Sequence, residues 1–268
     1  MVWWEAILLG LIQGLTEFLP VSSSGHLVLG QHLLGISSDD ITFEVFVHFG
    51  TVLSIATVYR KQIASIIGNT WLGVVEPSRI GLHYRGNEDF RLAIYILLSM
   101  IPTGVIYILF KDDLKSAFTN PRLVCLMLLV TGTLLLLTRL RKNPEGPLTP
   151  LKSILIGTAQ GVAMIPGISR SGATICTALY QNVTPETAAN FSFLMSVPVI
   201  LGATALESIE MFETGLSGAL LPILIGTLVA YLAGIVAIRI VLDFVRRGNL
   251  QYFAYYCFAI GILGLLFI

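Results

Sequence analysis

Six long apolar segments constrain this chain more than any other feature. A transmembrane helix needs about 20 predominantly apolar residues, and the segments that reach or approach this length lie at 41–59, 91–110, 122–138, 186–207, 218–240 and 250–268. Because 55% of the 268 residues are hydrophobic and only 12% are charged, the chain has too little polar surface to cover a soluble globule. The sequence therefore predicts an all-α integral membrane protein with six transmembrane helices.

Two further apolar runs, 6–19 and 153–165, are too short to cross a membrane, at about 14 residues each. Each run is followed by a break rich in serine and glycine, Pro20-Val-Ser-Ser-Ser-Gly25 or Pro166-Gly-Ile-Ser-Arg-Ser-Gly172, and then by a second short helical run at 26–35 or 173–181. This pattern is typical of a re-entrant helical hairpin, whose irregular backbone must be buried in protein or line a wet cavity.

The two hairpins resemble each other. A shift of 147 residues superposes six positions of the first on the second, namely Gly10 on Gly157, Gln13 on Gln160, Gly14 on Gly161, Ser22 on Ser169, Ser24 on Ser171 and Gly25 on Gly172. We therefore predict a single membrane domain made of two repeats, 1–142 and 150–268, each with one hairpin and three spans. An odd number of crossings gives the repeats opposite orientations, so the hairpins should enter from opposite faces and meet near the midplane.

The distribution of Lys and Arg predicts the topology. These residues gather on one set of alternate loops, at 60–91, 139–152 and 239–247, and the positive-inside rule places those loops in the cytoplasm. Both termini and the first hairpin then belong to the outer face. The segments 76–90 and 143–147 are expected to be ordinary connectors. With 16 basic and 16 acidic residues, the chain gives no reason to expect a nucleic-acid partner.

Glu17 and Gln13 are the polar residues of the first short run. A carboxylate at the end of an apolar run is costly unless it is paired or hydrated, which makes it a candidate functional residue. Gln13 lies four residues earlier on the same helix face. Together the two side chains could bind a metal ion bridged to phosphate oxygens, or Glu17 could act as an acid or base. Alternatively, Glu17 only lines a water-filled break.

His26 follows the turn formed by Ser22, Ser23, Ser24 and Gly25. An imidazole there could act as a base, an acid or a nucleophile toward phosphorus. The alternative for His26 is a structural hydrogen bond, and for the serines it is helix capping. What favours chemistry is that a carboxylate, three hydroxyls and an imidazole surround one break.

Arg170 lies in the second break between Ser169 and Ser171. A guanidinium at membrane depth needs an anionic partner, and the serines, the glycines and the start of the next helix could complete a phosphate cradle. An ion pair with Glu17 is compatible with that site, because substrate or metal could insert between the charges. Three polar residues within the spans are expected to line or pack rather than to contact substrate: Glu44, His48 and Asn190.

The stretches 13–26 (Gln-Gly-Leu-Thr-Glu-Phe-Leu-Pro-Val-Ser-Ser-Ser-Gly-His) and 166–174 (Pro-Gly-Ile-Ser-Arg-Ser-Gly-Ala-Thr) resemble the undecaprenyl-diphosphate phosphatases of the bacitracin-resistance type. The resemblance extends over nearly the whole chain. It implies hydrolysis of undecaprenyl diphosphate at the outer face of the bacterial inner membrane, which recycles the lipid carrier of peptidoglycan synthesis. It also implies dependence on a divalent cation, Mg²⁺ or Ca²⁺. Many relatives carry Glu at the position of Gln13, so this site has one charge fewer.

By this resemblance, the expected catalytic residues are Glu17, Ser23, His26 and Arg170. The expected phosphate-binding residues are Ser22, Ser24, Ser169, Arg170, Ser171 and Thr174, and a metal would lie near Glu17 and Gln13. The nucleophile is His26, Ser23 or water. The main alternative function is a transporter or flippase of a polyprenyl phosphate, because inverted repeats with broken helices are typical of alternating access. A homodimer is compatible with this architecture.

Overall fold

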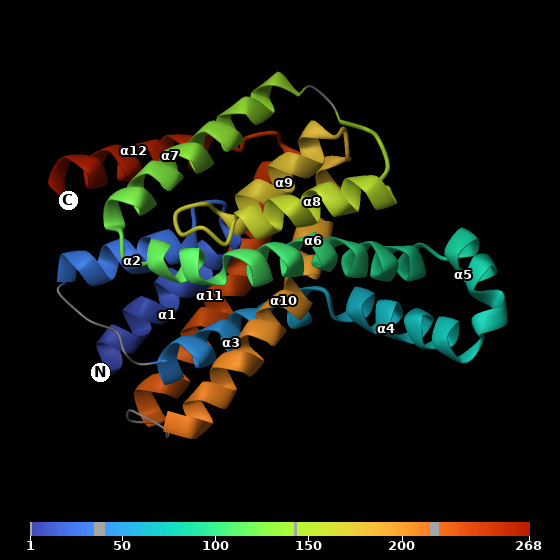
Figure 1. Cartoon of the computed structure of the whole chain (residues 1–268), viewed down its shortest axis with the longest axis horizontal. Coiled ribbons are helices and arrows are strands. Elements are labelled where there is room, and N and C mark those ends of the chain that lie inside the picture. The colour runs from blue at the N-terminus through green and yellow to red at the C-terminus, as the bar shows by residue number, and fades with distance from the viewer. Residues whose placement is uncertain (1, 35–40, 142–143, 215–219) are drawn as a thin grey trace.

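The computed structural model describes residues 2–34, 41–141, 144–214 and 220–268, and this part of the chain is helical apart from turns, 3₁₀ helices and one isolated bridge between Gly146 and Val183 (Figure 1). Its α-helices are α1 (Trp3–Phe18), α2 (Ser23–Leu34), α3 (Ile41–Val58), α4 (Arg60–Val75), α5 (Ile80–Gly86), α6 (Glu88–Ala117), α7 (Pro121–Leu137), α8 (Pro150–Val162), α9 (Arg170–Tyr180), α10 (Pro185–Thr214), α11 (Leu220–Arg246) and α12 (Gln251–Phe267). The predicted all-α class is confirmed. The predicted boundaries at residues 1, 35, 142, 143 and 218 lie outside the described residues.

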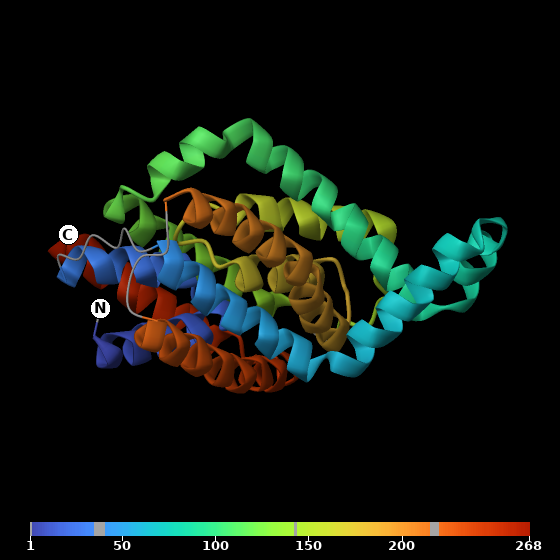
Figure 2. The ribbon, with the colours of Figure 1, turned by 90° about the horizontal axis from the view of Figure 1, so that it is seen from below.

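Within the described ranges, four helices are long and apolar enough to cross a membrane, namely α6, α7 with the turn that follows it, α10 and α11. Two shorter apolar helices coincide with the two other predicted spans. They are Phe43–Val58 in α3 and Gln251–Phe267, which is α12. The chain termini lie at the same end of the molecule, opposite to α5, in both views (Figures 1 and 2).

The segment 76–90 is not the ordinary connector that the sequence suggested. It contains a 3₁₀ turn at Pro77–Arg79, then α5 and the start of α6, and together with α4 it forms an arm that extends from the bundle (Figure 2). The arm is packed rather than open, because a Cβ added at Gly73 of α4 would clash with the Phe90 ring of α6. Pro77 had suggested a loop, but proline is well tolerated in the first turn of a helix.

Glycines bring α1 against α11 and α8 against α6. A Cβ added at Gly10 of α1 would lie 2.4 Å from the carbonyl oxygen of Gly226, and one added at Gly157 of α8 would lie 2.1 Å from that of Ser99. Gly10 and Gly157 are equivalent under the 147-residue shift. The first helix of each hairpin therefore packs closely on a long helix of the other half of the chain.

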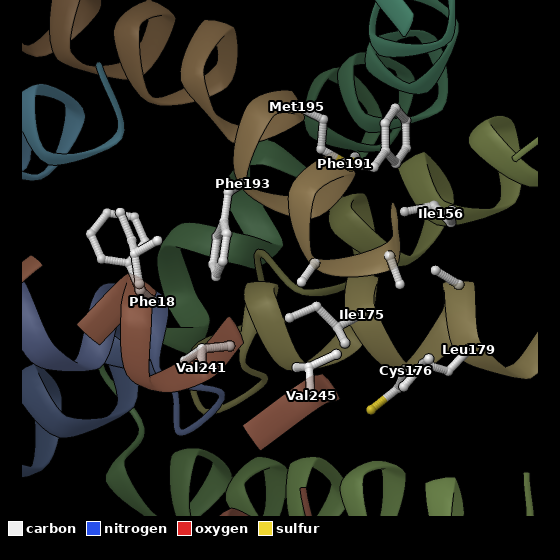
Figure 3. Packing of buried hydrophobic residues seen from close by; sticks show 14 of the residues in the cluster. Phe18, Ile156, Ile175, Cys176, Leu179, Phe191, Phe193, Met195, Val241 and Val245 are labelled. Atoms are coloured by element: carbon white, nitrogen blue, oxygen red, sulfur yellow. The ribbon is translucent and has the colours of Figure 1, made fainter. Parts of the chain in front are cut away.

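The largest hydrophobic core lies beside the ends of α1 and α9. The Phe18 ring, next to Glu17, packs edge to face on the Phe193 ring of α10, with 5.8 Å between ring centroids. Ile175 of α9 and Val241 of α11 belong to the same buried cluster (Figure 3). Fully buried aromatic and branched side chains fix rotamers and positions, so the polar residues at the two breaks rest on a rigid support.

Candidate active site

The first break lies between α1 and α2. Its turn places Ser22 at φ 70°, a left-handed conformation that is uncommon outside glycine. In this position the Ser22 Oγ accepts a hydrogen bond from the Gly25 backbone N–H at 3.2 Å. Ser22 therefore caps α2, as serine commonly does at a helix start.

The second break, between α8 and α9, is held by α7. Gly167 has φ +94°, and a Cβ there would lie 2.4 Å from the Val124 carbonyl oxygen, so only glycine fits. The Thr131 hydroxyl of α7 donates to the Gly167 carbonyl at 2.9 Å and accepts from the Ser169 N–H at 3.0 Å. Sequence reasoning missed Thr131, because a threonine in an apolar span carries no distinguishing pattern.

Ser169 repeats the role of Ser22. Its Oγ accepts from the Gly172 N–H at 3.1 Å and so caps α9. In each break the capping hydroxyl also lies close to the hydroxyl two residues later, at 3.3 Å for Ser22 and Ser24 and at 3.2 Å for Ser169 and Ser171. The two breaks therefore share one local hydrogen-bond pattern, 147 residues apart.

The two breaks also touch each other, as predicted. The Ser22 hydroxyl donates to the Ile168 carbonyl at 3.4 Å, and the Ser171 hydroxyl donates to the Leu19 carbonyl at 3.3 Å. Around one junction the chain thus gathers two helix starts and the polar side chains of both hairpins.

Glu17 is the centre of that junction. Its Oε1 accepts from the Arg170 Nη2 at 2.5 Å, and its Oε2 accepts from the Ser23 Oγ at 2.9 Å and the Gln13 Nε2 at 3.0 Å. The side chains of Glu17 and Arg170 are 8% and 18% exposed. The ion pair that the sequence left open as an alternative is therefore present, and a buried charge of this kind is tolerated because it is paired and hydrogen-bonded.

Arg170 retains capacity for an anion. A guanidinium has five N–H donors in a planar fork, and the contact with Glu17 is made through Nη2. Arg170 is also the first residue of α9, where the positive end of the helix dipole favours negative charge. A phosphate group that reaches this junction would find both a guanidinium and a helix N-terminus.

The His26 side chain is directed to α12. Its Nδ1 lies 2.8 Å from the Ser22 carbonyl oxygen, and its Nε2 lies 2.8 Å from the Tyr256 hydroxyl. Sequence reasoning identified His26 but not Tyr256, which is one of several tyrosines in the last span.

Three further residues that were predicted from the sequence, Thr174, Asn190 and His48, make the following contacts. Thr174 is buried and hydrogen-bonds within α9 and to the Ser192 hydroxyl of α10 at 2.6 Å. Asn190 accepts from the Tyr59 hydroxyl at 2.9 Å, toward the end of α3. The Nδ1 of His48 in α3 lies 2.8 Å from the Glu44 carbonyl oxygen of the same helix.

The donor set at the junction suits a shared cation rather than a protein cage. Within the described residues, no three His, Cys, Asp or Glu side chains gather in one place. Magnesium is commonly held by one or two carboxylates together with water and substrate phosphates. The Glu17 carboxylate and the Gln13 amide fit that mode of binding.

The sequence profile of the family described as "Bacitracin resistance protein BacA" matches residues 6–263. An undecaprenyl-diphosphatase of Salinibacter ruber is 60% identical over 267 residues, which cover 99% of each chain. An undecaprenyl-diphosphatase of Halothermothrix orenii is 44% identical over 264 residues, 97% of this chain and 96% of the relative. One of Alkaliphilus metalliredigens is 41% identical over 273 residues, 100% of this chain and 99% of the relative. The chain therefore belongs to the bacitracin resistance protein BacA family.

Proposed function

We propose that the protein hydrolyses undecaprenyl diphosphate to undecaprenyl phosphate and inorganic phosphate, and so recycles the lipid carrier of peptidoglycan synthesis. Family membership and the undecaprenyl-diphosphatases that match this chain over nearly its whole length support this function. The observation that carries the proposal is the buried Glu17–Arg170 pair at the junction of the two breaks. It offers a guanidinium to a diphosphate and a carboxylate to its counterion.

Arg170 and the start of α9 would bind and orient the diphosphate. Because the guanidinium and the helix N-terminus are fixed before substrate binds, they would stabilise the negative charge that develops in the transition state without reorganising. The nucleophile forms a bond to the terminal phosphorus while the bond from that phosphorus to the bridging oxygen breaks. The bridging oxygen leaves with its electron pair on undecaprenyl phosphate.

Three groups are candidates for the attacking atom, namely His26, Ser23 and a water molecule activated by His26. Ser23 donates to Glu17 Oε2 at 2.9 Å, and Arg170 binds the other oxygen of the same carboxylate. His26 is tied to Ser22 and Tyr256. Quenching during turnover separates these routes: phosphoserine survives an acid quench, phosphohistidine survives an alkaline quench but is hydrolysed in acid, and attack by water leaves no phosphate on the protein.

We also propose a divalent cation, Mg²⁺ or Ca²⁺, held by Glu17 and Gln13 together with substrate oxygens. Bound there, the cation would neutralise phosphate charge. In this arrangement Glu17 and Gln13 hold the cation, and Arg170 holds the diphosphate from the side of the second break.

For the membrane arrangement we propose six spans and two re-entrant hairpins, related as an inverted repeat in the bacterial inner membrane, with the site open to the outer face. The capping pattern shared by Ser22 and Ser169 supports the repeat. The packing between the two halves also supports it, because α1 packs on α11 and α8 packs on α6. The position of both termini opposite the Arg-containing arm supports the orientation.

Phosphate release from undecaprenyl diphosphate by the purified protein in detergent tests the function. We expect release that EDTA abolishes, that added Mg²⁺ or Ca²⁺ restores, and that His26→Gln loses. The absence of release by the folded protein in the presence of either cation would refute the proposal.

The transporter or flippase of a polyprenyl phosphate is the second candidate, and the two broken helical hairpins that meet at one junction favour it. A transporter needs a binding site but no nucleophile or base. His26→Gln should then leave lipid translocation in reconstituted vesicles intact. Loss of phosphate release with retained translocation would show that the protein has both activities and that only hydrolysis needs His26.

A further inference from the structure

The two ring nitrogens of His26 have different partners, and these partners fix the position of the proton. The Ser22 carbonyl oxygen, 2.8 Å from Nδ1, can only accept a hydrogen bond, so Nδ1 carries a hydrogen. In the neutral imidazole the other nitrogen, Nε2, then holds the lone pair. The Tyr256 hydroxyl, 2.8 Å from Nε2, donates to that lone pair.

Tyr256 also fixes the plane of the imidazole ring. Its ring is stacked on that of His26, with 5.5 Å between centroids and an interplanar angle of 8°. The next residue, Cys257, is buried and its thiol lies 3.8 Å from the Pro20 carbonyl oxygen in the first break. Two consecutive residues of α12 thus contact the first hairpin, one at each side of Ser22.

We propose that Tyr256 is a positioning residue that holds His26 in the Nδ1–H tautomer and leaves Nε2 as its single working nitrogen. This inference rests on the proposed diphosphatase function, in which His26 acts as a base or a nucleophile. If His26 acts as a base, Nε2 takes a proton from the attacking water, whose oxygen bonds to phosphorus. The Tyr256 oxygen then accepts from the new Nε2–H, and the Ser22 carbonyl continues to bind Nδ1–H.

The same geometry excludes Nδ1 as the reacting atom. For Nδ1 to attack, His26 would have to lose its hydrogen bond to the Ser22 carbonyl, which belongs to the residue that caps α2. For Nε2 to react, the Tyr256 hydroxyl has only to turn its hydrogen away from Nε2, and its oxygen can stay beside the ring to accept from the protonated nitrogen. Tyr256 is 43% exposed, so its side chain has room to move when substrate arrives.

Tyr256→Phe tests the proposal, because it keeps the stacked ring and removes the hydroxyl. We expect kcat for phosphate release to fall about tenfold, as for loss of one orienting hydrogen bond, while KM stays within about twofold, since Tyr256 acts through His26 and not on substrate. Tyr255→Phe is the matched control: it removes a hydroxyl from the adjacent residue of α12, which is 51% exposed, and should retain wild-type kcat and KM.

Nitrogen-15 NMR of protein labelled at its four histidines provides a readout that does not depend on activity, and the spectrum of His26→Gln assigns the His26 signals. The wild type should show one protonated and one unprotonated ring nitrogen on His26. In Tyr256→Phe the Nε2 signal should shift toward that of a free lone pair, and in Tyr255→Phe it should not.

Wild-type kcat together with an unchanged His26 signal in Tyr256→Phe would overturn the proposal. Full activity of His26→Gln would also overturn it while leaving the diphosphatase function intact. No release by the wild type would overturn the diphosphatase function instead, and the NMR comparison would then still decide whether the Tyr256 hydroxyl binds the His26 Nε2.

Discussion

Ser23 and Gln13 both donate to the same oxygen of Glu17, at 2.9 and 3.0 Å. Replacing Ser23 tests whether its hydroxyl only orients the Glu17 carboxylate or attacks phosphorus itself. If Ser23 only orients the carboxylate, Ser23→Ala should lower kcat about tenfold, as for loss of one hydrogen bond to a charged group. Ser23→Thr keeps the hydroxyl and is the control. A loss in Ser23→Ala as complete as that in His26→Gln, measured by phosphate release, would identify Ser23 as the nucleophile.

Gln13→Glu should make the site more dependent on a cation. The substitution sets a second carboxylate beside Glu17, where two negative charges repel each other unless a cation bridges them. We expect the Mg²⁺ concentration that gives half-maximal phosphate release to fall below that of the wild type. An unchanged Mg²⁺ titration would place the cation away from Gln13.

Among single residues, those with unusual chemistry for their surroundings could be predicted from the sequence. Glu17 and Arg170 stood out because a charge in an apolar segment needs a partner, and the structure pairs them at 2.5 Å. Tyr256 and Thr131 could not be predicted, since a hydroxyl in an apolar helix gives no sign of whether it binds a histidine, a loop carbonyl or its own backbone. Their roles depend on which helix lies opposite.

At the scale of elements, the contact between α8 and α6 depends on Gly157. Gly157→Ala would place a Cβ 2.1 Å from the Ser99 carbonyl oxygen, and relief of that overlap should lower the free energy of unfolding by about 1–3 kcal/mol. Gly104→Ala in α6 is the matched control, because an added Cβ there meets no atom within 4 Å. Equilibrium unfolding in mixed micelles measures both, and equal stability of the two variants would contradict the packing.

The elements themselves were predicted with different success. Both breaks were predicted from their proline, serine and glycine content, and they lie between α1 and α2 and between α8 and α9. The arm formed by α4 and α5 was missed, because Pro77, Gly81 and Gly86 suggested a connector. Pro77 begins a 3₁₀ helix, and Gly81 and Gly86 lie in the short helix α5. In a sequence, proline and glycine at the ends of short helices look the same as proline and glycine in a loop.

For the whole molecule, the proposed topology predicts that the tip of the arm and the turn between α6 and α7 lie on opposite sides of the membrane. The native cysteines are all buried, so single introduced cysteines can report exposure. We expect a membrane-impermeant maleimide to label Ser116→Cys in intact spheroplasts, and to label Gly81→Cys only after permeabilisation. Labelling of both from outside would refute the inverted arrangement.

For the molecule as a whole, the correspondence between the two breaks could be read from the sequence, but the packing of the two halves of the chain against each other could not. The 147-residue shift relates Gly10 to Gly157, yet nothing in the sequence identifies Gly226 and Ser99 as the residues that they contact. Packing partners far apart in the chain are chosen by shape, which a hydropathy pattern does not encode.

Phosphate release from undecaprenyl diphosphate by Arg170→Ala, compared with the wild type and with Glu17→Gln, tests most directly whether one site is built from both breaks. We predict that each variant folds in detergent and loses about 10²-fold to 10³-fold in kcat/KM, as for removal of a preorganised charge-stabilising group. Near-native turnover by either folded variant would contradict the assignment of the active site to the Glu17–Arg170 junction.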